Sequence, residues 1–170
     1  MEEKQPKEPP GFNIRYTEPA DAKFLLEWLS DPDTLRWFPM REPAEIEDSV
    51  NRWIGFSRFK SSLTATIDGV PCGLSTLYLQ AYRTLMHQCE FGIIVGPDYR
   101  GRGVGFHLMR NIMHLAKDYF KVELLHLQVH AENPAMTFYK KFGFREFGRQ
   151  THWEKDEGVY MARVMMERFL

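Results

Sequence analysis

Apolar residues recur along this chain with two different periods, and the changes between these periods predict the order of its elements. Ala22, Leu25 and Leu29 repeat at helical spacing, whereas apolar and polar residues alternate over residues 63–67 as in a strand. Helical spacing predicts four helices, at about residues 17–30, 43–55, 104–118 and 135–142. Alternation predicts strands at about residues 12–16, 62–67, 70–79, 87–95, 122–130, 144–153 and 159–168.

The connections between these elements predict a mixed sheet. Asp68-Gly69 is a strong hairpin signal, and the polar turn at residues 154–158 joins the last two strands as a second antiparallel pair. The helix at residues 104–118 crosses over between two strands, which predicts a parallel pair there. The apolar stripe of this helix consists of Val104, Leu108, Ile112, Leu115 and Tyr119.

We therefore expect an α/β (α+β) fold: one domain over residues 12–170, with about six or seven strands and about four helices. Residues 1–11 hold three Glu, two Lys and three Pro, a composition that predicts a flexible tail.

Charge and composition narrow the functional classes. Lys and Arg total 22 against 23 Asp and Glu, so there is no basic excess to indicate a nucleic-acid partner. We find no apolar run of transmembrane length and no signal-peptide core, and the two cysteines lie in apolar strands as expected for reduced thiols. These features predict a cytoplasmic protein with no membrane partner. The six histidines show no metal-ligand spacing, so no metal is expected.

The most informative stretch is a glycine-rich turn between an apolar strand and an amphipathic helix. Main-chain N–H groups at a helix start have no partner within the helix, and the helix dipole adds positive character there. Gly101, Gly103 and Gly105 leave the backbone bare, while Arg100 and Arg102 add charge. This combination predicts an anion site, most often one for phosphate.

Two motifs resemble those of the GCN5-related N-acetyltransferase (GNAT) family. The first is Pro97-Asp98-Tyr99-Arg100-Gly101-Arg102-Gly103-Val104-Gly105, close to the family's Pro-x-x-Arg-Gly-x-Gly-x-Gly. The second is Asn133-Pro134-Ala135-Met136-Thr137-Phe138-Tyr139 followed by Phe142-Gly143-Phe144. The resemblance covers about residues 12–168 and is strongest over residues 90–144.

The resemblance implies acetyl-CoA, or another acyl-CoA, as co-substrate and an amine, on a small molecule or a protein, as acceptor. It also implies that two central strands part after Gly92 to admit the pantetheine arm. The cofactor-binding residues that it implies are Ile93, Ile94 and Val95 through their backbone, Arg100, Gly101, Arg102, Gly103, Val104 and Gly105 around the pyrophosphate, and Asn133 and Phe138 on the other wall. Asn133 stands six residues before Tyr139, one fewer than is usual in the family.

Attack by an amine requires a proton acceptor, because an alkyl amine with a pKa of about 10 is almost entirely protonated at neutral pH. Alternation along residues 87–95 places Glu90 on the sparser face of its strand, so we predict Glu90 as the base, acting directly or through water. The ordinary alternative is a sheet-edge carboxylate paired with an arginine. Relatives that use a Glu on the following strand would have it at Gln128, which cannot accept a proton.

Tyr139 occupies the family position of the acid that protonates the departing thiolate. The alternative role for Tyr139 is that of an aromatic side chain packed under the sheet. His130 lies at a strand end, where it could join a proton path or simply make a structural hydrogen bond.

The aromatic loop at residues 35–40 is where relatives build the acceptor pocket. Trp37 and Phe38 are therefore the predicted substrate-binding residues, with a hydrophobic plug over the sheet as the alternative. Relatives commonly dimerise through their last two strands, so a homodimer is possible here.

Three functions remain to be compared. The first is an acyl-CoA-dependent N-acetyltransferase acting on a protein N-terminus, a lysine or a small molecule. The second is a catalytically silent acyl-CoA-binding sensor or recruiting module. The third, a nucleotide-phosphate binder of another fold, is disfavoured because the Walker lysine is absent and antiparallel strands precede the glycines.

Overall fold

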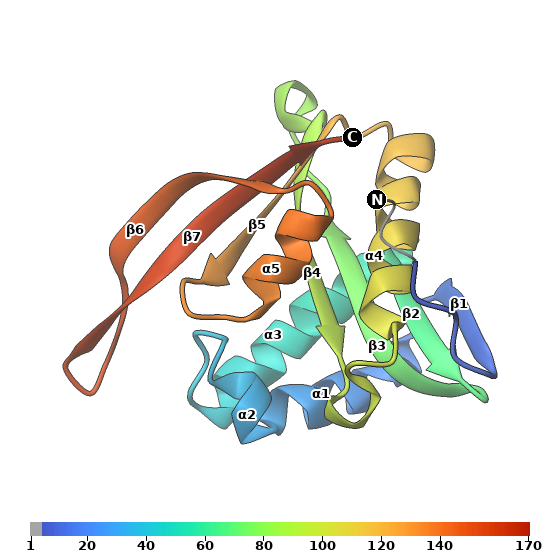
Figure 1. Cartoon of the computed structure of the whole chain (residues 1–170), viewed down its shortest axis with the longest axis horizontal. Helices are drawn as coiled ribbons and strands as arrows, with labels where there is room; N and C mark the ends of the chain where they lie inside the picture. The colour runs from blue at the N-terminus through green and yellow to red at the C-terminus, as the bar shows by residue number, and fades with distance from the viewer. Residues whose placement is uncertain (1–4) are drawn as a thin grey trace.

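A computed structural model describes residues 5–170, in which seven strands form one sheet in the order β1-β2-β3-β4-β5-β7-β6 (Figure 1). The strands are β1 (Phe12–Tyr16), β2 (Ser62–Ile67), β3 (Val70–Tyr78), β4 (Gln88–Val95), β5 (Leu124–His130), β6 (Arg145–Asp156) and β7 (Val159–Phe169). The α-helices of the described residues are α1 (Ala22–Ser30), α2 (Pro32–Leu35), α3 (Pro43–Gly55), α4 (Val104–His114) and α5 (Ala135–Lys141). Only the β4–β5 pair is parallel, as predicted, so the mixed sheet and the α/β (α+β) fold are confirmed.

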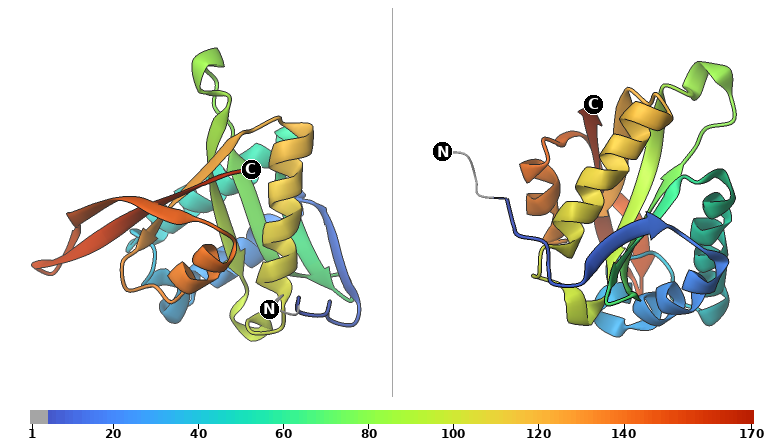
Figure 2. Two further views of the ribbon diagram at one scale, coloured as in Figure 1. Left: turned by 45° about the horizontal axis from the view of Figure 1, so that its top comes forward. Right: turned by 90° about the vertical axis from the view of Figure 1, so that its right-hand side faces the viewer.

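Helices cover both faces of the sheet and create two core clusters (Figures 1 and 2). One cluster lies between the sheet and α4, with the aromatic residues of α5 at its border. The other lies beneath α1 and α3, where Leu74 and Ile94 of the sheet meet Trp28 and Trp53. Successive residues of β4 therefore face different clusters, which explains why that strand reads as apolar on one face and mixed on the other.

Two helical predictions need correction. The loop expected after Ser30 begins with the short helix α2, because the Asp31 side chain caps it by accepting from the Thr34 amide, and Pro32 suits its first turn. Tyr119 does not continue the apolar stripe of α4. The chain turns π-helical over Leu115–Tyr119, which rotates this side chain outward, and it is 62% exposed.

The predicted tail at residues 1–11 lies partly outside the described residues. Residues 5–11 form no helix or strand, yet they contact α4. The His107 ring hydrogen-bonds with the Pro6 carbonyl at 3.0 Å, and Arg110 donates to the Gln5 side chain at 2.9 Å. Pro6 is thereby placed beside the glycine-rich loop.

The sheet opens between β4 and β5. These strands pair at only three positions, ending with Glu90 opposite His126. The parting thus begins two residues before the expected Gly92. Beyond it β4 stays paired with β3 as far as Val95, and β5 stays paired with β7 as far as His130.

The long hairpin of β6 and β7 projects from the body of the protein (Figure 1). Several large apolar side chains on it are exposed, including Phe147 and Tyr160. A homodimer through this hairpin stays a prediction. None of the helices formed by residues 5–170 is long and apolar enough to span a membrane.

Gly92 is required by a close approach between β4 and α3. A Cβ atom at this position would lie 2.6 Å from Cζ2 of Trp53, far inside van der Waals contact. We therefore expect Gly92→Ala to lower the free energy of unfolding by about 1–3 kcal/mol, as overpacking does. Denaturant unfolding checks this, with Gly55→Ala as the matched control because nothing lies within 4 Å of a Cβ there. Equal stability of the two variants would contradict the packing argument.

Candidate functional site

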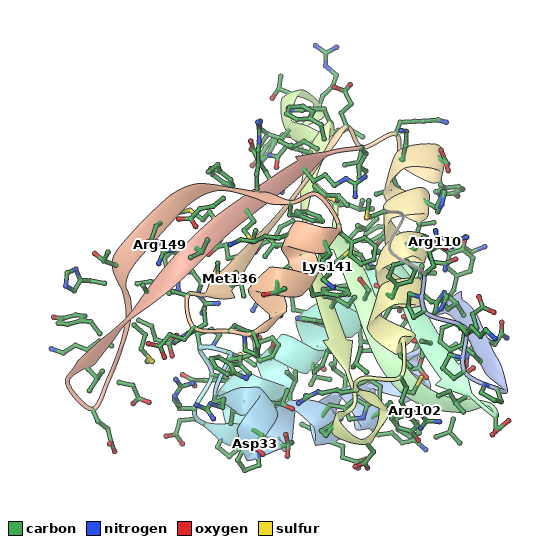
Figure 3. All side chains as sticks on the ribbon, in the orientation of Figure 1. Asp33, Arg102, Arg110, Met136, Lys141 and Arg149 are labelled. Carbon is green, nitrogen blue, oxygen red and sulfur yellow. The ribbon has the colours of Figure 1, made fainter. Side chains whose placement is uncertain are left out.

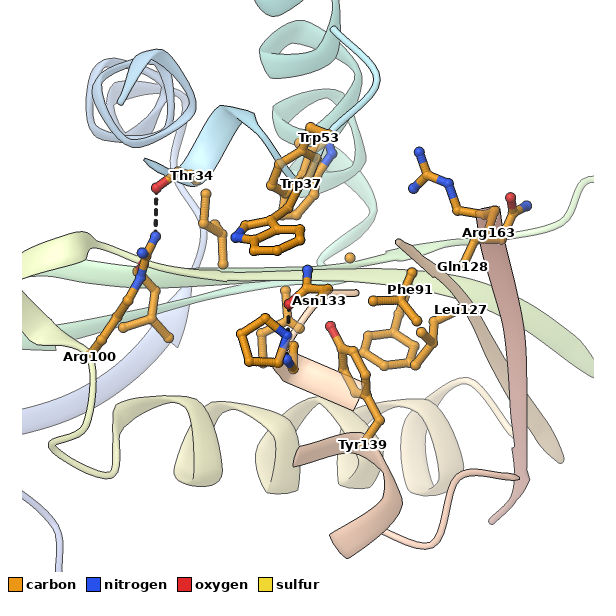
Figure 4. A pocket seen from close by; sticks show the side chains of 18 residues that line it. Thr34, Trp37, Trp53, Phe91, Arg100, Leu127, Gln128, Asn133, Tyr139 and Arg163 are labelled. Atoms are coloured by element: carbon orange, nitrogen blue, oxygen red, sulfur yellow. Dashed lines mark hydrogen bonds between the residues drawn. The ribbon is translucent and has the colours of Figure 1, made fainter. Parts of the chain in front are cut away.

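Three adjoining cavities run from one face of the sheet to the other through the opening between β4 and β5. The loop cavity, about 550 Å³, lies by the glycine-rich loop and α5. The gap cavity, about 300 Å³, lies in the opening and shares Ile93, Val95 and Tyr139 with the first (Figure 4). The α3 cavity, about 570 Å³, lies on the opposite face and shares Phe91 and Gln128 with the gap cavity.

The loop cavity ends at the turn that precedes α4. Gly103 has a φ of +86° and is the N-cap of this helix, a backbone conformation that glycine adopts without strain. Gly101, Gly103 and Gly105 line this cavity, and the N–H groups of the first turn of a helix have no partner within the helix. Such a loop end suits an anion, and the anion site stays a prediction.

The two arginines of the loop differ in their placement. Arg100 lines the cavity, donates to Thr34 Oγ1 at 2.6 Å and to the Val95 carbonyl at 3.2 Å, and so ties the loop to α2 and β4. Arg102 is exposed, with its guanidinium 5.7 Å from the Tyr99 ring (Figure 3). Val104 is buried in the core, which leaves only its backbone for a ligand.

The edge of β4 presents main-chain groups to the gap cavity. The Gly96 amide donates to β3, and alternate residues of a strand direct their main-chain groups to the same side. The main-chain N–H and C=O groups of Ile94 therefore point toward β3 as well. Those of Ile93 and Val95 point toward the opening on the β5 side. The main-chain contacts predicted for Ile94 are thus best made by its two neighbours, while its own side chain is buried in the cluster beneath α1 and α3.

The opposite wall comes from α5 and the turn before it. Asn133 lines the gap cavity, and its side-chain oxygen accepts from the Ala135 amide at 2.9 Å. Phe138 lines the loop cavity. Tyr139 packs edge-on against Phe91, with its hydroxyl directed into the opening (Figure 4). Burial raises the pKa of this phenol to about 12, so it is protonated at neutral pH.

Glu90 lies on the other face of the sheet and lines the α3 cavity. Burial raises the pKa of its carboxyl group above the ordinary value, and the positive charges of Arg52 and Arg163 offset part of that rise. A carboxylate and a phenol thus approach the same opening from opposite faces.

Trp37 and Phe38 both line the gap cavity, so the aromatic loop borders the site as expected. Trp53 of α3 also lines it (Figure 4). Arg163 and Trp153 of the final hairpin line the α3 cavity and were not anticipated. The sequence contains one sign of a role for Arg163, which is a charged residue within an apolar strand.

His130 makes a structural hydrogen bond. Its Nδ1 atom accepts from the Glu132 amide at 3.2 Å, and its ring packs edge-on against Trp37. This arrangement matches the ordinary alternative at a strand end. Among residues 5–170, no three His, Cys, Asp or Glu side chains are grouped so as to hold a metal ion.

Known proteins show related sequences and folds. L-amino acid N-acetyltransferase AaaT of Escherichia coli (strain K12) is 33% identical over 107 residues, which cover 62% of this chain and 66% of that protein. Spermidine N(1)-acetyltransferase of the same strain is 24% identical over 160 residues, covering 92% of this chain and 84% of that protein. The yncA protein of Salmonella typhimurium, whose structure contains its cofactor acetyl-CoA, superposes with a TM-score of 0.79 at 15% identity, covering 94% of each chain.

The family match extends over most of the domain. The model of the family described as Acetyltransferase (GNAT) domain matches residues 12–145, which include the whole opening of the sheet, the glycine-rich loop and α5. The match, the two motifs and the parted strands agree, and the chain belongs to the GNAT acetyltransferase family.

Proposed function

We propose that this protein transfers the acetyl group of acetyl-CoA to a primary amine, on a small molecule or a protein, by direct attack of the amine on the thioester. The observation that carries the proposal is the passage through the sheet, with the glycine-rich loop at one end and Glu90 at the other. It lets the two substrates meet from opposite faces.

The residues around the passage fit acetyl-CoA as co-substrate. The N–H groups of the loop before α4 would hold its pyrophosphate, with Arg100 alongside, and Asn133 and Phe138 would border the pantetheine arm. The main-chain groups of Ile93 and Val95 would bond to that arm as a neighbouring strand does. A Val95 N–H directed into the opening is placed to stabilise negative charge on the thioester oxygen.

Glu90 and Tyr139 divide the proton transfers between them. Glu90 accepts the proton that the amine loses as its nitrogen bonds to the thioester carbon, directly or through water. Tyr139 donates its proton to the sulfur as the carbon–sulfur bond breaks. The raised pKa of each group suits its role, since a less acidic carboxyl is a stronger base and a buried phenol retains its proton until it is needed.

Glu90→Gln should lower kcat/KM by about 100-fold or more, because the amine must then lose its proton to solvent. In the wild type only the deprotonated carboxylate is active, so activity should rise with pH through the raised pKa of Glu90. The variant should lose that limb of the profile. Initial rates of thiol release between pH 5 and pH 9 check this, with Glu146→Gln on β6 as control. An unchanged profile in Glu90→Gln would remove Glu90 from the mechanism.

Tyr139→Phe should lower kcat by about 10- to 100-fold while leaving acetyl-CoA binding intact, since only the hydroxyl is lost and the ring still packs on Phe91. Steady-state kinetics and calorimetric binding measure the two effects. Tyr119→Phe, remote and exposed, should behave as the wild type. A full-rate Tyr139→Phe enzyme would favour the packing explanation.

Gly105→Ala should separate stability from cofactor binding. Its Cβ would be 3.5 Å from Val95 Cγ2 and 3.8 Å from Phe138 Cζ, which are ordinary contacts inside the loop cavity. Alanine favours a helix by up to about 1 kcal/mol, so the free protein should be at least as stable as the wild type. The added methyl group occupies space that acetyl-CoA needs, and we expect the Kd for acetyl-CoA to rise at least tenfold. Unchanged affinity would contradict this placement of the co-substrate.

Saturable binding of acetyl-CoA by the wild type without turnover of any amine would instead favour the silent acyl-CoA-binding module.

A further inference from the structure

We propose that the acceptor is an α-amino acid, and that Arg163 binds its carboxylate while its amine faces Glu90. This inference rests on the proposed function and concerns the α3 cavity, the side of the passage away from the glycine-rich loop. It assigns to Arg163 a role in acceptor selection.

Arg163 is a buried cation whose charge is only partly neutralised. Arg163 lies within β7, and its side chain is 10% exposed. Its guanidinium contacts Glu154 at 3.5 Å, the limit of a hydrogen bond, while Arg41 already bonds to the other oxygen of that carboxylate at 2.5 Å. The planar group has five donors, which leaves several for an oxygen ligand in the cavity.

The position of Arg163 directs those donors toward the acceptor. Arg163 lines both the gap cavity and the α3 cavity, so it lies beside the route that an acceptor must take (Figure 4). A guanidinium binds a carboxylate through two parallel hydrogen bonds, a geometry that a lysine cannot reproduce.

The other charged residues of this cavity strengthen the same preference. Arg52 on α3 is exposed at the cavity, and Glu90 is the single acidic residue in its lining among the residues described. The Glu90 carboxylate can neutralise the ammonium group of the acceptor. The positive charges of Arg52 and Arg163 then remain. An α-amino acid supplies the missing negative charge. A polyamine or an extended lysine side chain would bring further positive charge toward Arg52 and Arg163, and like charges at close range oppose binding.

The remaining wall suits an apolar side chain. Trp53, Phe56 and Trp153 line the cavity, and the Trp153 ring also packs with the Arg163 guanidinium at 5.7 Å. Aromatic surfaces of this kind bind hydrophobic groups, while a few polar groups set the orientation of the ligand. The cavity can therefore hold the amine, the carboxylate and the side chain of one amino acid together.

The test is a comparison of matched acceptors with the full chain and acetyl-CoA. L-leucine, L-methionine and L-phenylalanine are each paired with their amides and with the amines that lack the carboxyl group, and spermidine is added. The α-amine of an amide is less basic and so more often neutral at pH 7, which means that reactivity alone favours the amide. We expect kcat/KM at least about tenfold higher for an amino acid than for its amide.

Two arginine variants and one control test which residues cause the preference for an amino acid over its amide. Arg163→Met should raise KM for the amino acid and reduce its advantage over the amide to about threefold or less. Arg52→Ala should reduce the advantage to a smaller extent, and it keeps the test decisive if Arg163→Met does not fold, because Arg52 is exposed. Arg149→Met, on the exposed side of β6 (Figure 3), should retain the wild-type preference.

The outcomes separate the inference from the proposed function. Equal or better acetylation of the amides, the carboxyl-free amines or spermidine by the wild type would overturn the inference and leave the acetyltransferase proposal standing. A folded Arg163→Met variant with an unchanged preference would also overturn it. Acetylation of none of these amines by a protein that binds acetyl-CoA would overturn the proposed function itself.

Discussion

The parting of β4 from β5 is the constraint on which the site depends. β4 remains paired with β3 as far as Val95, and β5 remains paired with β7 as far as His130, so each strand keeps its outer neighbour where the two part. Buried main-chain groups at a parted edge must find partners in a ligand or in water. The fold thereby keeps main-chain groups without a strand partner, those of Ile93 and the Val95 N–H among them, inside the protein rather than at its rim.

The opening also brings together chemistry that belongs to different faces. Glu90 belongs to the face covered by α3, and Tyr139 comes from α5 on the other face, yet both reach the same passage. Burial makes the carboxyl less acidic and keeps the phenol protonated. A single sheet therefore separates a buried carboxyl group from a buried phenol and leaves an opening between them.

The family match and the lining of the α3 cavity involve partly different stretches of the chain. The glycine-rich loop, the opening and α5 all lie within the stretch that matches the GNAT domain. Arg163 and Trp153 come from the final hairpin, beyond that stretch, and Trp53 is held over Gly92 by close packing. The relatives that match this chain are named for acceptors as different as an L-amino acid and spermidine.

The sequence by itself determined the order of strands and helices, the glycine-rich turn before α4 and the face on which Glu90 lies, because these follow from local periodicity and from short motifs. The π-helical turn that exposes Tyr119 and the capped helix α2 depend on local hydrogen bonds that periodicity does not report. The tertiary structure alone decided that the strands part at Glu90, that Trp53 covers Gly92 and that Arg163 lines the same cavity as Glu90. These contacts join residues far apart in the chain, and their geometry arises only when the sheet twists and the helices pack on it.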